Sequence, residues 1–247
     1  MKKFIFIIPI IFFFWIVMEI YCRLPNKLDI IKINAPIKTQ TMILLFHGSN
    51  DHKNLELEAI ADKYSTYYNS HRNIEVINYD WSYASSYLKA SANAIKIGNV
   101  LGLEISNLKE LKNIHIIAHS AGSFIAESFC QSYKNNDGVA HIETTFLDPF
   151  NLRGLSDFNY GARTHGKCAD FASSIINTDD QAPTTNSILE NAWNIDVTNI
   201  DRPKYFKRTG HYFPPLFYLL SMNEDTFKMR IKNHNDYPRG GLLRARN

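Results

Sequence analysis

Short runs of apolar residues recur along the chain, and each run ends at turn-forming residues. Four such runs lie at 41–46, 74–79, 114–118 and 142–147, and a weaker one lies at 193–197. Apolar runs of this length, bounded by turn residues, are typical of strands that are buried on both faces of a parallel sheet. The pattern therefore predicts a core of parallel strands.

Segments with helical spacing lie between these runs. Apolar residues recur at intervals of three and four over 54–69, 88–95, 101–108 and 121–133, and an apolar helix is expected from about 213 to 222. Strands that alternate with helices imply right-handed crossovers, so we expect an α/β fold with a mostly parallel central sheet flanked by helices. Binding sites in such sheets lie at the carboxyl ends of the strands.

Residues 150–190 interrupt this alternation. The stretch is rich in Asn, Asp, Ser, Thr and Gly, and its one strong apolar run is 174–176. A long irregular stretch inside a compact domain usually has a function or is disordered. We expect a lid-like insertion that covers a substrate.

The N-terminal segment has a different composition from the rest. Lys2 and Lys3 precede an unbroken apolar run over 4–18. A positive start followed by such a run is typical of an export signal, and the run is slightly short for a spanning helix, which needs roughly 20 apolar residues. No small-x-small cleavage site follows, so a cleaved signal and an uncleaved membrane anchor both remain open. Lipidation of Cys22 and burial of the segment in the core are two further possibilities.

Either form of export takes the rest of the chain out of the cytoplasm, to the periplasm or beyond the cell. An uncleaved segment would in addition associate with the membrane through residues 4–18. We therefore divide the chain into a signal or anchor over 1–22, a linker over 23–40 and one folded domain over 41–247. Hydrophobic residues make up 45% and charged residues 21% of the chain, which is an ordinary globular balance. The net charge of +3, from scattered Lys and Arg, gives no reason to expect a nucleic-acid partner.

The cysteines do not form the framework of this domain. Past the N-terminal segment only Cys130 and Cys168 remain. In an exported protein the two could form a disulfide, and they could equally be two buried free thiols. The sequence leaves both possibilities open.

The strongest chemical signal is a serine between a predicted strand and a predicted helix. Ser120 follows the apolar run 114–118, with Ala118 two residues before it and Gly122 two residues after it. Small residues at these positions allow the sharp turn of the nucleophile elbow G-x-S-x-G, which here begins with Ala in place of Gly. We interpret Ser120 as a nucleophile, and the alternative is a purely structural turn.

A serine hydroxyl needs a base, and the base needs a carboxylate that orients it. Among the nine histidines, His211 lies on a loop after Gly210, late in the chain, as the order Ser, acid, His requires. Asp148 ends the run 142–147, at the tip of a buried strand. Asp170 and Asp196 are its rivals, and a turn-forming Asp-Pro is the structural alternative.

An oxyanion needs two hydrogen-bond donors, which are commonly backbone amides. The amide of Ala121, at the start of the predicted helix, is one candidate. Gly48 follows the first strand and permits the backbone to turn an amide inward, so the amide of Ser49 is the other candidate.

Taken together, these residues resemble the pancreatic-lipase-type family of α/β-hydrolases. The resemblance rests on Leu44-Leu45-Phe46-His47-Gly48, Tyr79-Asp80-Trp81, the elbow at 113–122 and Leu147-Asp148-Pro149. It covers roughly residues 41–150, and more weakly 196–214. The order of these motifs along the chain is more specific than any one of them alone.

The resemblance implies an α/β-hydrolase in which Ser120 is the nucleophile, Asp148 the acid and His211 the base, with Ser49 and Ala121 as oxyanion donors. It implies lipid or other carboxylic esters as substrates, a lid between the acid and the histidine, and chemistry that needs no metal and no cofactor. An acyltransferase or amidase could use the same triad. A non-catalytic binding protein on this scaffold is the alternative from another class.

Overall fold

A single sheet forms the centre of the computed structural model, which describes residues 7–51, 54–179, 182, 184–227 and 238–246. Within these residues the sheet has seven strands in the order β2-β1-β3-β4-β5-β6-β7, and every neighbouring pair is parallel. The strands are β1 (Thr41–Phe46), β2 (Ile74–Tyr79), β3 (Asn113–His119), β4 (His141–Leu147), β5 (Phe171–Ile176), β6 (Trp193–Asp196) and β7 (Leu242–Arg244). The expected α/β class is confirmed.

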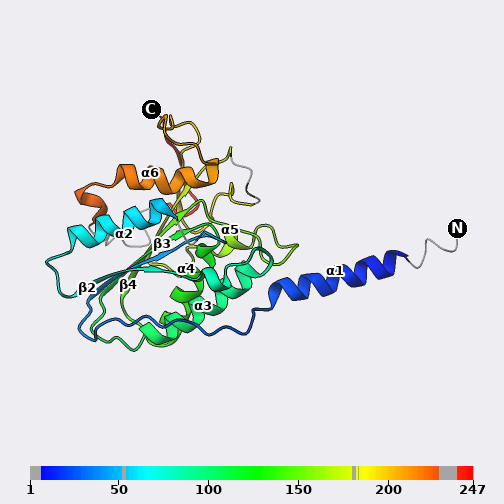
Figure 1. Ribbon diagram of the computed structural model, residues 1–247, viewed down its shortest axis with the longest axis horizontal. Helices are drawn as coiled ribbons and strands as arrows, with labels where there is room; N and C mark the ends of the chain where they lie inside the picture. The colour runs from blue at the N-terminus through cyan, green and yellow to red at the C-terminus, as the bar shows by residue number, and fades with distance from the viewer. Residues whose placement is uncertain (1–6, 52–53, 180–181, 183, 228–237, 247) are drawn as a thin grey trace.

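Helices cover both faces of the sheet (Figure 1). One face packs against α3 (Ala90–Ile105) and α4 (Gly122–Asn135), and the other against α2 (Leu55–Tyr67) and α6 (Phe213–Ser221). The two segments predicted over 88–95 and 101–108 form the single helix α3. Shorter helical elements are α5 (Tyr160–Thr164), η1 (Ser82–Ala84), η2 (Tyr87–Lys89), η3 (Gly210–Tyr212) and η4 (Glu224–Phe227).

Alternation along β1 explains why the sheet is buried on both faces. Met42, Leu44 and Phe46 face the α3–α4 layer, while Ile43 and Leu45 face the α2–α6 layer. All five side chains are almost fully buried. Because side chains point alternately to the two faces of a strand, a strand covered on both faces must be apolar throughout.

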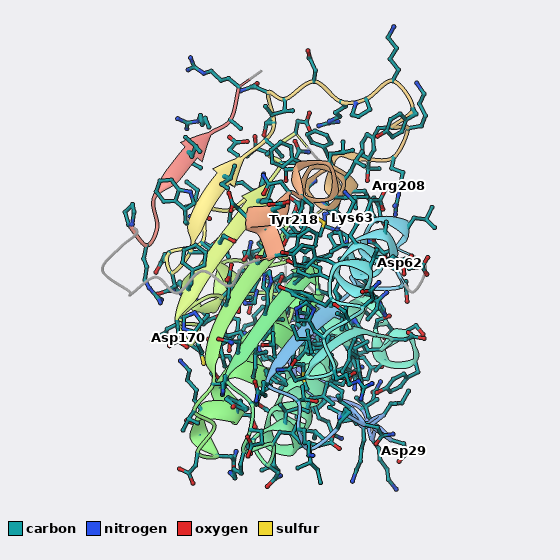
Figure 2. The ribbon with its side chains drawn as sticks, turned by 90° about the vertical axis from the view of Figure 1, so that its left-hand side faces the viewer. Asp29, Asp62, Lys63, Asp170, Arg208 and Tyr218 are labelled. Atoms are coloured by element: carbon teal, nitrogen blue, oxygen red, sulfur yellow. A yellow bond between two sulfur atoms is a disulfide. The ribbon has the colours of Figure 1, made fainter. Side chains whose placement is uncertain are left out.

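The α2–α6 layer is held together by polar contacts as well as by packing. Lys63 of α2 donates a hydrogen bond to the carbonyl of Leu219, at 3.0 Å, and the hydroxyls of Tyr64 and Tyr218 lie 2.9 Å apart. Figure 2 labels Lys63 and Tyr218 at this contact. The two helices therefore form one layer, although about 150 residues separate them in the sequence.

The structure corrects the expectation of an irregular insertion over 150–190. This stretch contains α5 and β5, and β5 lies inside the sheet between β4 and β6. The sequence signal was weak because the small residues Ala172, Ser173 and Ser174 form the middle of this strand, yet all three are buried. The short strand β7 was not predicted either.

The chain begins with α1 (Ile7–Arg23), which projects away from the sheet (Figure 1). Among the described residues, no helix is both long enough and apolar enough to cross a membrane. Arg23, the first residue of the expected linker over 23–40, still belongs to α1. The rest of the linker has no helix or strand, but Ile33 is buried in the core.

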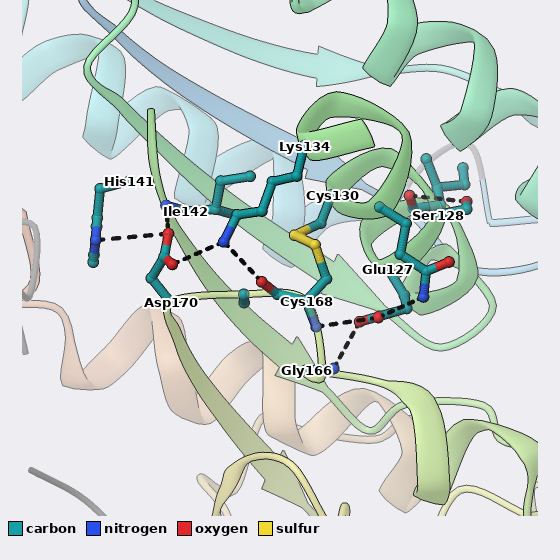
Figure 3. The surroundings of a disulfide bond; sticks show 12 residues. Glu127, Ser128, Cys130, Lys134, His141, Ile142, Gly166, Cys168 and Asp170 are labelled. Carbon is teal, nitrogen blue, oxygen red and sulfur yellow. Dashed lines mark hydrogen bonds and ion pairs between the residues drawn. A yellow bond between two sulfur atoms is a disulfide. The ribbon is translucent and has the colours of Figure 1, made fainter. Parts of the chain in front are cut away.

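Cys130 and Cys168 form a disulfide, with Cα atoms 5.9 Å apart, which joins α4 to the segment that precedes β5 (Figure 3). Lys134, one turn further along α4, bonds the carbonyl of Cys168 at 3.0 Å and the carboxylate of Asp170 at 2.8 Å. Asp170, a rival for the acid in the sequence, is therefore part of this structural cluster.

Glu127 of α4 also binds the segment that precedes β5. Its carboxylate accepts hydrogen bonds from the amides of Gly166, at 2.9 Å, and Cys168, at 3.3 Å. Burial raises the pKa of Glu127 to about 7, against the effect of these bonds. Together with the disulfide, Glu127 anchors the segment before β5 to α4, the helix that follows Ser120.

We expect the variant Cys130→Ser/Cys168→Ser to have a free energy of unfolding about 3–4 kcal/mol below that of the parent protein. The bond closes a loop with a sequence separation of 38, and its loss frees the unfolded chain. Urea denaturation of the oxidised parent and the variant measures the difference. Equal free energies of unfolding would contradict the assigned role of the disulfide.

Candidate active site

Ser120 lies on a sharp turn between β3 and α4. Its φ of +51° is in the left-handed region, which costs a residue with a side chain of order 1–3 kcal/mol. The amide of Ser120 donates to the carbonyl of Leu147, and its carbonyl accepts from the amide of Phe150, each at 3.1 Å. These bonds to the end of β4 and the loop after it hold the strained conformation in place.

Two glycines allow the end of β1 to approach this turn. A Cβ on Gly122 would lie 2.5 Å from the carbonyl oxygen of Phe46, and a Cβ on Gly48 would lie 2.9 Å from the Cβ of Ser120. Both distances are shorter than the non-bonded contacts that Cβ atoms make in proteins. Ala118, which stands where the motif has its first glycine, is fully buried and part of the core, so its methyl group is accommodated.

Asp148 and His211 form a close pair. Nδ1 of His211 donates to Oδ2 of Asp148 at 2.7 Å, and the amide of Asn177 donates to Oδ1 at 2.9 Å. Asp148 is fully buried at the end of β4, with a φ of +48°, and His211 lies on η3 with 14% of its side chain exposed. Nδ1 is therefore the ring nitrogen that contacts the carboxylate, and Nε2 lies on the other side of the imidazole ring.

A cavity of ≈ 330 Å³ brings the expected residues together. Ser120, His211, Ser49 and Ala121 all line it, and Asp148 lies behind His211. The cavity lies at the carboxyl ends of β1 and β3, where the strand order reverses, which is the usual place for a binding site in such sheets. Its remaining lining is mainly apolar: Leu88, Ala90, Phe150, Ala182 and Tyr212, with Gly48, Asp51 and His119.

A larger cavity, of ≈ 760 Å³, lies on the α6 side of the sheet. Its lining includes His115, Glu143 and Thr145 but none of the five expected site residues. Volume alone does not identify the site, because the smaller cavity is the one in which a strained serine and a carboxylate-bound histidine meet.

The amides of Ser49 and Ala121 have no hydrogen-bond acceptor within the described part of the chain. His47 controls the first of them. Its Nδ1–H donates to the carbonyl of Gly48 at 2.8 Å, and the peptide bond that follows is trans. Because the C=O and N–H of a trans peptide point in opposite directions, this bond turns the Ser49 N–H away from His47.

Trp81 fixes the ring that controls this peptide. Its backbone amide donates to Nε2 of His47 at 3.2 Å, and its indole Nε1–H donates to the carbonyl of His47 at 2.8 Å. The sequence showed His47 only as a neighbour of Gly48. Its positioning role depends on Trp81, in the segment that follows β2, which nothing local to His47 could reveal.

His119 binds the backbone of the loop that carries His211. Its Nε2–H donates to the carbonyl of His211 at 3.1 Å, and Nδ1 accepts from the side chain of Asn54 at 3.2 Å. Burial lowers the pKa of His119 to about 4, with a further contribution from His211 and against the effect of the Asp51 carboxylate, which lies 3.3 Å from Nδ1. The ring is therefore neutral and can make both bonds at once. Asn54 also caps α2 through a bond from the amide of Leu57.

Arg208 ties the same loop to α2. Its guanidinium pairs with Glu56, lies 3.7 Å from Asp51, and stacks 3.3 Å from the ring centre of Tyr212 (Arg208 is labelled in Figure 2). His211 is thus held by Asp148, by His119 and by its neighbour Arg208. The sequence indicated only the first of these contacts.

No model of a protein family matches the chain, and no curated protein matches it either.

We expect Gly122→Ala to lower the free energy of unfolding by about 1–3 kcal/mol, because the added methyl group would overlap the backbone of β1. Chemical denaturation measures the loss. Ser123→Ala, in the same turn of α4, is the control: its buried hydroxyl has no hydrogen-bond partner in the described structure, and its removal should leave stability unchanged or slightly higher. Equal stability of Gly122→Ala and the parent would exclude the close approach.

Proposed function

We propose that the protein is a serine hydrolase of the α/β-hydrolase fold that cleaves carboxylic esters. The observation that carries this proposal is the combination of a serine at φ +51° and a histidine bonded at 2.7 Å to a buried aspartate, on the rim of one cavity. A strained serine at the top of a parallel sheet, followed along the chain by an acid and then a histidine, is the arrangement of this fold.

In the first step, Oγ of Ser120 attacks the ester carbonyl carbon while Nε2 of His211 takes the hydroxyl proton. Asp148 stabilises the imidazolium that forms, and the amides of Ser49 and Ala121 donate to the oxyanion. The tetrahedral intermediate then collapses. The bond to the alkoxy oxygen breaks, His211 returns its proton to the departing alcohol, and the acyl group stays on Ser120.

In the second step, water attacks the acyl-enzyme. His211 takes a proton from the water, the same two amides donate to the new oxyanion, and the carboxylic acid leaves as Ser120 regains its proton. Each step needs only acid–base groups and backbone donors of this chain. His47, His119 and Arg208 act by positioning these groups.

The apolar walls of the cavity support esters with an apolar acyl group, including lipid esters, as substrates. Leu88 and Phe150 offer aliphatic and aromatic surface next to Ser120. We accordingly propose a lipase-like or esterase-like enzyme of the pancreatic-lipase type. Residues of the predicted lid region take part, since Phe150 and Ala182 belong to it.

We also propose that the enzyme is exported. The disulfide between Cys130 and Cys168 supports this location, because such bonds form and persist in oxidising compartments.

Replacing Ser120 by Ala should abolish hydrolysis of a p-nitrophenyl ester, because the acyl-enzyme forms on the hydroxyl that the variant lacks. Turnover is the measurement, and circular dichroism checks that the variant keeps the fold. A fluorophosphonate probe should label the parent protein at Ser120 and leave the variant unlabelled. Full turnover by the variant would reject Ser120 as the nucleophile.

The variant Asp148→Asn should lower kcat by about 10⁴-fold, since an amide can neither hold the required tautomer nor stabilise the imidazolium. Steady-state kinetics on the same ester measures the change. Asp62→Asn removes one carboxylate from an exposed position on α2 and should leave kcat at the parent value. If both variants behave alike, Asp148 is not the acid of the triad.

A further inference from the structure

The described part of α1 exposes apolar side chains on every side. Residues 10–14 (Ile10, Ile11, Phe12, Phe13 and Phe14) each expose 60% or more of their surface, and Trp15 exposes 45%. Successive residues of a helix are separated by a rotation of about 100°, so six consecutive apolar positions surround it completely. A protein groove covers one side of a helix, whereas hydrocarbon surrounds it.

The other end of α1 is polar and attached to the domain. The carboxylate of Glu19 accepts hydrogen bonds from the amide of Leu155, at 2.6 Å, and the hydroxyl of Ser156, at 2.8 Å. The ammonium group of Lys89 lies 4.0 Å from the ring centre of Tyr21, and Cys22 is fully buried. The last turn of α1 is therefore an integral part of the folded domain.

A basic groove lies at this attachment. It has a volume of ≈ 320 Å³, and Arg23, Lys96 and Arg153 line it together with Pro25, Ala92, Ile95, Asn99 and Val100. Arg23 pairs with Glu19, whereas neither Lys96 nor Arg153 has a carboxylate partner among the described residues. Lys96 instead donates to the carbonyl of Asn26, and Arg153 stacks on the ring of Tyr160. The groove thus combines excess positive charge with several apolar lining residues.

We propose that α1 inserts into the hydrocarbon of a lipid bilayer and that the basic groove binds the phosphate of an anionic phospholipid. Guanidinium and ammonium groups are the usual partners of phosphate, and basic residues close to a membrane are attracted to anionic lipids. The groove lies at the polar end of α1. When the apolar part of α1 is in hydrocarbon, this end lies at the depth of the lipid headgroups. The charge of the groove and the apolarity of the helix thus match one and the same partner.

One contact of α1 also lies next to a residue of the catalytic cavity. Lys89, which contacts Tyr21, belongs to η2, and its neighbour Leu88 lines the cavity. The attachment of α1 therefore places the lipid surface next to the rim of the cavity. Lipid binding itself does not depend on the proposed catalysis, so the two proposals can fail separately.

The test uses the full chain and sucrose-loaded vesicles, either of phosphatidylcholine alone or of phosphatidylcholine mixed with phosphatidylglycerol. Sedimentation should bring down the protein with both kinds of vesicle, and more strongly with the anionic kind. The variant Lys96→Gln/Arg153→Gln should bind anionic vesicles about 25-fold more weakly, from about fivefold for each cation, and neutral vesicles as before. The variant Lys109→Gln/Lys112→Gln makes the same charge change beyond the far end of α3, and should bind both kinds like the parent.

The helix is tested separately by Phe12→Ser/Phe13→Ser, which should weaken binding to both kinds of vesicle. Hydrolysis of a soluble short-chain ester should be unchanged in all of these variants, which keeps this test apart from that of Ser120. Several outcomes would overturn the proposal. These are parent-like vesicle binding by Phe12→Ser/Phe13→Ser, equal effects of the two charge variants, pairing of α1 with a second copy in place of vesicle binding, or recovery of the secreted protein without residues 1–22.

Discussion

The site depends on one backbone constraint, the left-handed conformation of Ser120. A serine rarely adopts φ +51°, and in a folded protein its surroundings have to hold it there. Here the enforcement comes from both sides: β4 and the loop after it bond the peptide groups of Ser120, and Gly122 and Gly48 let the end of β1 press against the turn. Contacts from β4, from the loop after it and from the end of β1 thus hold the Ser120 hydroxyl at the rim of the cavity.

The histidine is positioned by a different principle. η3 is a short element of three residues, Gly210–Tyr212. It is held by side chains from three distant segments: Asp148 at the end of β4, His119 at the end of β3 and, through Arg208, Glu56 of α2. Because His119 stays neutral, it can accept from one neighbour and donate to another without adding charge beside His211.

The N-terminal helix is attached to the folded domain by tertiary contacts. Its composition alone was compatible with a cleaved signal or a retained anchor. In the folded protein Glu19 bonds the backbone of Leu155, and Cys22 is buried, so removal of this segment would expose a contact of the domain. That tertiary contact, together with the basic groove beside it, is the reason for proposing a retained, lipid-bound helix.

The amino-acid sequence by itself determined the α/β class, the positions of most strands and helices, and the five candidate residues of the site, because burial on both faces of a sheet and sharp turns impose local patterns. It did not reveal β5, whose small polar residues are buried only because neighbouring strands surround them. The roles of His47 and Arg208 and the pairing of Cys130 with Cys168 were likewise decided by the tertiary structure. Each depends on a partner that is distant in the chain, and only folding brings the two together.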